Sequence, residues 1–199
     1  MILKFTMKNF VLSVLLLPIF LCLSFPAFAA STKKKSNEDK DIHVMQAVRD
    51  SDYETLQKIL KDKANPDAKD SMERTALMIA ARDNNLKAAK ILILAGADVN
   101  IKNRTEGKTA LIYAATYGYE KMVKLLLKKG ALIDVKDLEG KTALIYAVIF
   151  DRPAVVKVLI DNKANIFSRT DSDESAMSIA NSSGRIKISE MLKQAGAKD

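Results

Sequence analysis

Apolar residues recur along the chain in blocks that begin with a hydroxyl residue and lie 33 or 34 residues apart. Residues 109–114 read TALIYA, and residues 142–147 repeat them letter for letter. Weaker copies start at Thr75 and Ser175, and a fainter fifth copy covers residues 47–64. A fixed period of this length predicts stacked structural repeats, each of which is one supersecondary unit.

Each repeat is predicted to contain two helices. The threonine or serine that opens a block can cap a short first helix, and the alanines that follow allow neighbouring repeats to approach closely. A second, more apolar segment supplies larger core side chains, such as Leu126 in the central copy. Pro153 lies at the start of one such segment, where its missing N–H does no harm. Gly96, Gly130 and Gly196 lie just past predicted helix ends.

The first and last copies are predicted to be caps of the array. The first lacks a preceding hairpin sequence; Asp41 can cap its first helix, and residues 53–61 form its second. Between copies, residues 67–74 and 100–108 are expected to form hairpin loops, the second one residue longer. The predicted fold class is therefore all-α with short β-hairpin loops, an α-solenoid of about five repeats.

The residues of the central copy follow a familiar order. They are Gly107, Thr109, Ala110, Leu111, Ala114, Ala115, Gly118, Val123, Leu126, Leu127, Gly130 and Ala131. This pattern resembles the ankyrin repeat, and GADVN at residues 96–100 matches the family's repeat ending. The resemblance covers residues 41–199 and implies paired helices and protein binding through a concave face.

The chain departs from the family pattern at two positions of each repeat. Alanine stands where the family carries proline after the threonine, and the usual histidine two residues later is absent. Its place is taken by Met78, Ile112, Ile145 and Ser178. We expect apolar packing to replace the hydrogen bonds that this histidine makes.

Residues 1–29 differ in composition from the rest of the chain. Lys4 and Lys8 precede an apolar run over residues 10–25, and Ala27 and Ala29 form an A-x-A site. These features are typical of a secretory signal peptide of the bacterial exported type, with cleavage after Ala29.

Two alternatives concern the same segment. An uncleaved anchor would need roughly 20 apolar residues, and here Pro18 interrupts a shorter run. A lipid anchor on Cys22 would require Gly or Ala at the preceding position, which is Leu21.

Cleavage would change the chemistry of the chain. It removes Cys22, the one cysteine, and two lysines, so the net charge falls from +8 to +6. Residues 30–40 are polar and are predicted to be a disordered linker. The predicted divisions are a signal peptide (1–29), this linker, an N-terminal cap repeat (41–69), repeats at 70–102, 103–136 and 137–169, and a C-terminal cap repeat (170–199). No later segment is long and apolar enough to cross a membrane, and the predicted localisation is periplasmic or secreted.

The sequence offers little catalytic chemistry. His43 is the one histidine, and no cysteine remains to pair with it after cleavage. Asp171, Asp173 and Glu174 resemble part of a calcium loop but lack its following glycine and distant glutamate. Gly-rich phosphate loops are absent. We therefore expect no enzyme activity, no metal and no cofactor.

The family resemblance implies that loop tips and the exposed sides of first helices contact partners. In this strip Tyr117, Ile149 and Phe150 are apolar where the repeat pattern does not require it, and cations flank them. Aromatic residues ringed by cations are typical of a protein-binding hot spot. Alternatively, Ile149 and Phe150 pack against the next repeat. The predicted partner-binding residues are Arg74, Arg82, Lys108, Tyr117, Leu138, Lys141, Ile149 and Phe150.

These features predict an exported, monomeric, non-catalytic module that binds another protein carrying an acidic and apolar patch. A secreted effector that binds a host protein, and an accessory or inhibitor subunit of a periplasmic enzyme, are the alternatives. Nucleic-acid binding is the weaker expectation.

Overall fold

The computed structural model describes residues 40–198, whose buried apolar side chains join in one hydrophobic core. The predicted signal peptide and residues 30–39 of the predicted linker lie outside the described residues. Within residues 40–198 the regular structure is helical, apart from two isolated antiparallel bridges that join Lys69 to Thr75 and Arg169 to Ser175. None of these helices combines the length and the apolar character that a bilayer crossing requires.

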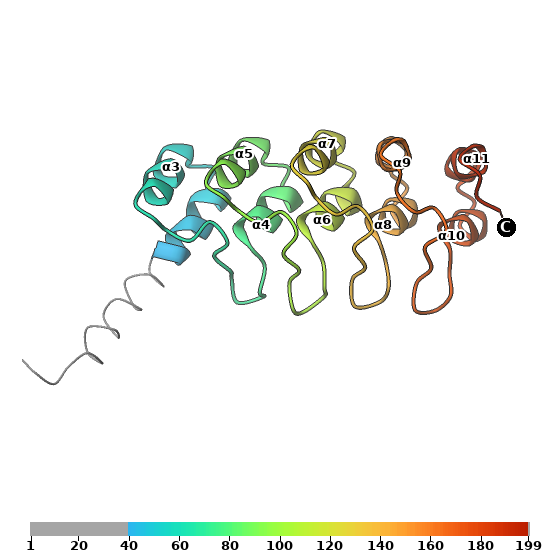
Figure 1. The fold of residues 1–199 in the computed structure, drawn as a ribbon, viewed down its shortest axis with the longest axis horizontal. Helices are drawn as coiled ribbons and strands as arrows, with labels where there is room; N and C mark the ends of the chain where they lie inside the picture. Colours follow the sequence, from blue (N-terminus) through green and yellow to red (C-terminus); the bar gives the residue numbers. More distant parts are fainter. Residues whose placement is uncertain (1–39, 199) are drawn as a thin grey trace, which may run out of the picture. The chain divides into compact units, whose positions relative to one another are not determined.

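The helices alternate between two layers (Figure 1). Residues 40–49 are helical, so this helix begins before Asp41, which is not its N-cap. The first helices of the next four repeats lie beside the loops and are α4 (Ala76–Arg82), α6 (Ala110–Tyr117), α8 (Ala143–Ile149) and α10 (Ala176–Ser182). The second helices form the other layer and are α3 (Tyr53–Lys61), α5 (Leu86–Leu94), α7 (Glu120–Lys128), α9 (Pro153–Asp161) and α11 (Ile186–Gln194).

The predicted hydroxyl caps are confirmed in these four repeats. The side chains of Thr75, Thr109, Thr142 and Ser175 accept hydrogen bonds from the backbone N–H three residues later, at 3.3, 3.3, 3.4 and 3.0 Å. Each hydroxyl thus satisfies one of the N–H groups that the first turn of a helix leaves without a partner.

The position of the missing histidine is filled in two ways. Ile112 and Ile145 are fully buried, which confirms apolar packing there. At Ser178 the expectation is wrong, because its hydroxyl accepts a hydrogen bond from the Ser175 N–H at 2.9 Å. Met78 does both: it is buried, and its sulfur accepts from the Thr75 N–H at 3.4 Å.

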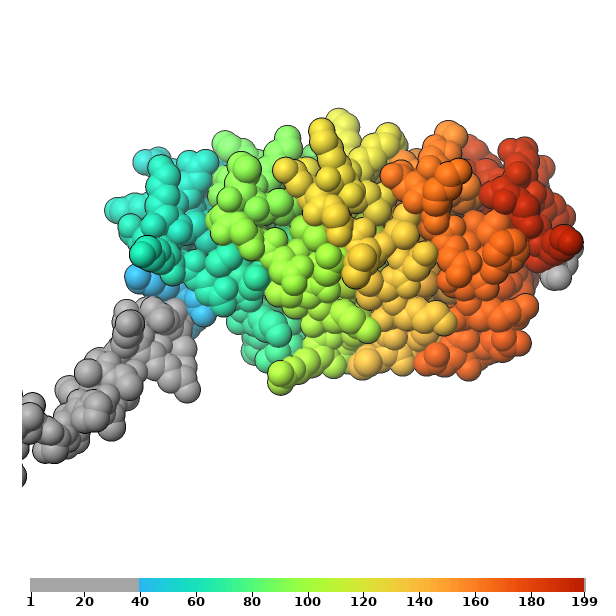
Figure 2. Space-filling view, viewed as in Figure 1, coloured from blue at the N-terminus to red at the C-terminus, as the bar shows by residue number. Residues whose placement is uncertain are grey.

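Neighbouring repeats meet through small side chains on the first helices. α4 packs on α6, α6 on α8, and α8 on α10. Figure 2 shows each repeat as a band of colour that borders its neighbours in chain order. The alanines predicted at these contacts are fully buried, and they are Ala80, Ala81, Ala114, Ala115, Ala147 and Ala180.

Hydrogen bonds also join one repeat to the next at the C-terminal ends of the first helices. The side chain of Arg152 donates to the Thr116 carbonyl at 3.1 Å, and that of Arg185 donates to the Ile149 carbonyl at 2.8 Å. Each arginine directly precedes a second helix. A cation at this place satisfies carbonyl groups that a helix end leaves unpaired and complements the helix dipole.

The loops pair with one another through their backbones. The Leu138 N–H donates to the Glu106 carbonyl at 3.0 Å, and the Asp171 N–H donates to the Glu139 carbonyl at 3.1 Å. This approach requires glycine at Gly107, whose φ is +74° and where a Cβ would lie 2.8 Å from the Leu138 nitrogen. Neighbouring loops of these repeats are therefore in direct backbone contact.

Replacing Gly107 by alanine tests this packing. Alanine at positive φ costs roughly 1–2 kcal/mol. Gly130 has φ +86° but nothing within 4 Å of a Cβ, so Gly130→Ala is the matched control. We expect Gly107→Ala to lower the free energy of unfolding by roughly 1–3 kcal/mol more than the control, because of the added crowding. Urea titration measures both values, and equal losses would contradict the role assigned to the loop contact.

Candidate partner-binding surface

The residues predicted to bind a partner lie in the loops and at the C-terminal ends of the first helices. Arg74, Lys108 and Lys141 each directly precede the N-cap residue of a first helix. Arg82 and Tyr117 are the last residues of α4 and α6. The repeat register thus gives residues of consecutive repeats equivalent positions in the loops and in the first helices, which lie next to one another in Figure 1.

Two stacked pairs of aromatic rings lie at the ends of α6 and α8. Tyr117 stacks on Tyr119 with 5.9 Å between ring centroids, and Phe150 stacks on Tyr146 at 6.3 Å. Tyr117 and Phe150 are each 44% exposed. They occupy the same register position, because Phe150 is the C-cap of α8 and follows Tyr117 by 33 residues. We call these two residues, with their stacking partners, the aromatic strip.

The other two apolar residues predicted at the surface differ in exposure. Ile149 is half-buried and packs against the core. Its carbonyl accepts the hydrogen bond from Arg185. Leu138 is 61% exposed in the loop before α8. The apolar contact surface therefore consists of Tyr117, Phe150 and Leu138 more than of Ile149.

All four predicted cations are held by carboxylates of their own repeats. Three of the nitrogen–oxygen distances are 2.7 Å, in the pairs Arg74–Asp70, Arg82–Asp83 and Lys108–Glu106. Lys141 pairs with Glu139. The Arg74 side chain is only 14% exposed. Each of the four cations thus has its charge balanced by a neighbouring carboxylate, and Lys108 also lies over the ring of Tyr146.

A network of tyrosines and carboxylates lies beneath these cations, and the sequence did not predict it. The Tyr113 hydroxyl donates to Glu106 at 2.6 Å, and the Tyr146 hydroxyl donates to Asp137 at 2.7 Å. The Lys108 ammonium lies over both rings, 5.9 Å from the Tyr113 centroid and 5.0 Å from that of Tyr146. Lys108 thus connects two repeats through cation–π contacts.

Each of these loops is held by a side-chain acceptor at one register position. Asp137 is buried, and its carboxylate accepts from the N–H groups of Glu139 and Lys141 at 3.0 and 2.8 Å. The residues equivalent to Asp137 make similar bonds in the other loops, and they are Asp70, Asn103 and Thr170. The sequence feature that could have predicted these hydrogen bonds is the recurrence of an Asp, Asn or Thr at this spacing.

Burial and hydrogen bonding shift the pKa values in this network. Burial raises the pKa of Tyr113 and Tyr146 well above 10.0, and the hydrogen bonds to Glu106 and Asp137 raise them further. For Glu106 burial acts to raise the pKa, but hydrogen bonds from Lys108 and Tyr113 outweigh it and the pKa is lowered. The tyrosines are therefore neutral donors and Glu106 is an ionised acceptor at neutral pH.

The residues that the sequence offered for catalysis or metal binding lie exposed on the surface. His43 lies exposed in the first repeat, and no group of three or more His, Cys, Asp or Glu side chains in residues 40–198 is placed to hold a metal. The carboxylates at Asp171, Asp173 and Glu174 are exposed, and Asp173 pairs with Arg169 at 3.4 Å.

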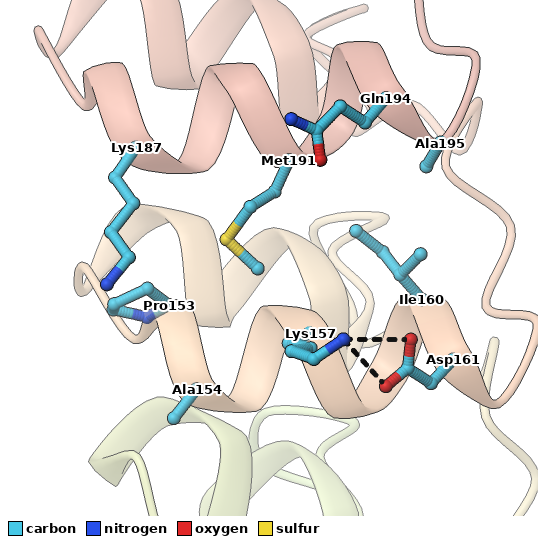
Figure 3. Close-up of a pocket in the computed structure, with 9 residues that line it drawn as sticks. All are labelled: Pro153, Ala154, Lys157, Ile160, Asp161, Lys187, Met191, Gln194 and Ala195. Atoms are coloured by element: carbon cyan, nitrogen blue, oxygen red, sulfur yellow. Dashed lines mark hydrogen bonds and ion pairs between the residues drawn. The ribbon is translucent and has the colours of Figure 1, made fainter.

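A groove of about 560 Å³ lies between α9 and α11 in the layer of second helices (Figure 3). Met191 and Ile160 line its apolar part, and Lys157 and Asp161 form an ion pair beside it. None of the eight predicted partner-binding residues lines this groove.

The two layers, the repeat register and the hydroxyl caps define an α-helical repeat protein of the solenoid class. A model of three tandem ankyrin repeats matches residues 44–137, and a single-repeat model matches residues 139–171. Together these matches cover more than half of the chain, which therefore belongs to the ankyrin-repeat family. Ankyrin repeats are in general non-catalytic modules of protein–protein interaction, and they imply a protein partner for this chain.

Similarity to two curated proteins is confined to part of the chain. A mitochondrial disaggregase of Homo sapiens is 31% identical over 81 residues, which is 41% of this chain and 12% of that protein. The mitochondrial disaggregase of Bos taurus is 34% identical over 67 residues, 34% of this chain and 10% of that protein. The chain thus matches about a tenth of the length of these relatives, at the level of the repeats.

The tyrosine–carboxylate bonds predict a loss of stability at high pH. Tyrosine titrates near pH 10 in an unfolded chain. Because the folded-state pKa values of Tyr113 and Tyr146 are raised, their contribution is fully present below pH 10.0 and is lost as the pH rises above it. Each buried tyrosine should lower the free energy of unfolding by up to about 1.4 kcal/mol per pH unit in that range.

Comparison of wild type with the Tyr113→Phe/Tyr146→Phe variant measures this effect. The variant should start less stable at pH 8, since two buried hydrogen bonds to carboxylates are gone, but should lose less stability between pH 10 and 11. Urea titrations at each pH give the slopes. Parallel slopes would contradict the assignment of raised pKa values to these two side chains.

Proposed function

We propose that this chain is an exported, non-catalytic interaction module that binds another protein through its loops and first helices. The observation that carries the proposal is the aromatic strip. Tyr117 and Phe150 are both exposed. The neighbouring repeats carry polar residues at the same register position, Asp83 and Ser183. Stacking of the repeats therefore does not require aromatic rings there. Exposed aromatic side chains of this kind are enriched at protein interfaces.

The ion pairs on this surface limit how strongly acidic groups of a partner can contribute to binding. A free cation would attract carboxylates directly, but Lys108 and Lys141 are already paired with Glu106 and Glu139. A partner carboxylate must replace these acids or join the pairs, so charge contributes more to orientation than to affinity. Apolar contact with Tyr117, Phe150 and Leu138 would supply most of the binding energy. We propose a partner with an apolar patch and acidic residues at its edge.

Preformed geometry favours this mode of binding. The hydroxyl of Tyr146 donates a hydrogen bond to Asp137, and its ring stacks on that of Phe150. A side chain that is held before association loses less conformational freedom on binding. The aromatic strip can therefore bind without a large rearrangement.

The exported location rests on the composition of residues 1–29. A secreted effector that binds a host protein and an accessory or inhibitor subunit of a periplasmic enzyme would use the same surface and differ in their targets. The activity named for the disaggregase relatives is not proposed for this chain, because the similarity covers only their repeats. Fractionation of the producing cell and its medium tests the location: retention of the chain in the cytosol would contradict export.

A double substitution tests the binding surface. We expect Tyr117→Ala with Phe150→Asp to abolish capture of the partner while shifting the circular-dichroism melt by only a few degrees, because both residues are exposed. The matched control is Ile186→Ala with Phe167→Asp, since both residues are exposed apolar side chains of the C-terminal repeats and the charge change is the same.

The partner is first isolated by affinity capture from the periplasm or the medium and identified by mass spectrometry. Binding of the purified partner is then measured by calorimetry for wild type and both variants. If the control loses binding as well, or if the Tyr117/Phe150 variant unfolds, the aromatic strip is a structural element and the proposal fails.

A further inference from the structure

The second helices present a regular set of solvent-facing positions. The second, fifth and ninth residues of each helix point away from the core, because they are spaced i, i+3 and i+7. In α7 all three are lysines, Lys121, Lys124 and Lys128, and all are exposed. In α5 the same positions hold two exposed lysines and a leucine, and they are Lys87, Lys90 and Leu94. We call these six residues the α5–α7 face.

The neighbouring second helices do not share this composition. Each of them has a carboxylate among the equivalent three positions: Glu54 in α3, Asp161 in α9 and Glu190 in α11. The α5–α7 face has none. The enrichment in lysine is therefore a property of two adjacent repeats and not of the repeat pattern as a whole.

Most of the charge on this face is not balanced locally. Lys124 pairs with Glu120, and Lys87 lies over the Tyr53 ring at 4.3 Å. Among the described residues no carboxylate forms an ion pair with Lys90, Lys121 or Lys128. The loop side differs, because the cations predicted there are all paired. Positive charge that is free to attract an anion is thus concentrated on the layer of second helices.

We propose that the α5–α7 face binds the anionic surface of a lipid bilayer. Figure 1 shows the second helices side by side in one layer, an arrangement that suits an extended surface. The lysine ammonium groups would contact lipid phosphates, and such contacts add together when several lysines lie close to an anionic leaflet. Leu94 is 81% exposed within the same face and would enter the boundary between headgroups and acyl chains.

The side chains of this face fit a bilayer better than a nucleic acid. Its six positions include no arginine for bidentate contacts with bases or phosphates and no aromatic ring for stacking on bases. An exposed leucine beside these lysines would also make no favourable contact with a phosphate backbone. A lipid surface uses both the charge and the leucine.

Vesicle sedimentation tests this proposal. The polypeptide is residues 30–199, since residues 40–198 hold their own core. We expect it to sediment with phosphatidylcholine vesicles that contain phosphatidylserine, to stay in solution with pure phosphatidylcholine, and to be released by high salt. The variant Lys90→Glu/Lys121→Glu/Lys128→Glu should bind at least about tenfold more weakly.

The matched control is Lys63→Glu/Lys163→Glu/Lys193→Glu, which changes the net charge equally at exposed lysines outside the face. It should lose about twofold at most. Leu94→Gln should weaken vesicle binding several-fold while leaving retention on duplex DNA unchanged. Circular dichroism confirms that each variant is folded.

Three results would overturn the proposal: no sedimentation of the wild type with anionic vesicles, equal losses in the two triple variants, or DNA binding that is tighter than vesicle binding. The Tyr117/Phe150 variant serves as a further comparison. It should retain full vesicle binding, so the failure of either proposal can be recognised separately.

Discussion

The repeats of this protein depend on one another for burial and for hydrogen bonding. The first helices of the four later repeats are only 7 or 8 residues long, too short to persist alone in water. Their alanines are buried only because a neighbouring helix lies against them. The polar ends of these helices depend on the neighbour too, since Arg152 and Arg185 bond carbonyls of the preceding repeat. Contact between repeats therefore determines both the fold and its stability.

The sequence predicted the parts of this structure that recur with the repeat. Thr109 and Thr142 are caps because a hydroxyl before an apolar run can satisfy free N–H groups, and that argument needs only local sequence. Gly130 follows a helix end for an equally local reason. Such features are repeated at 33 or 34 residues, so each copy supports the interpretation of the others.

The contacts of the candidate surface were harder to predict because they join side chains of different repeats. The register shows that Lys108 and Lys141 are equivalent, but it cannot show that Lys108 lies over the ring of Tyr146. It also cannot show that Glu106 holds Lys108 while accepting from Tyr113. These pairs depend on side-chain direction and on which acid happens to be near. The positions of the cations were therefore predicted, and their pairing was not.

The two proposed binding faces lie on different layers of the unit, which follows from the requirement that repeats stack. Stacking uses the small side chains of the first helices and the inward positions of the second helices. It leaves free the loop side and the outward positions of the second helices (Figure 1). Tyr117 and Phe150 occupy the first of these surfaces, and Lys121 and Lys128 occupy the second. A protein bound on the loop side would leave the lysines accessible.

The position of the aromatic strip in the array also favours its rigidity. A series of bonds links each repeat to the next near the ends of the second helices: the side chains of Asp67, Asn100 and Asp134 accept from backbone N–H groups at 3.0, 2.8 and 2.9 Å. The next residue in this register is Phe167, which has no acceptor, and the groove between α9 and α11 begins at the same repeat boundary (Figure 3). The last repeat therefore lacks this link, although Arg185 and the Asp171 N–H still bond it to the preceding repeat. Because repeat arrays open from their weakest interface, fraying should begin there and leave α6 and α8, which carry the strip, in place.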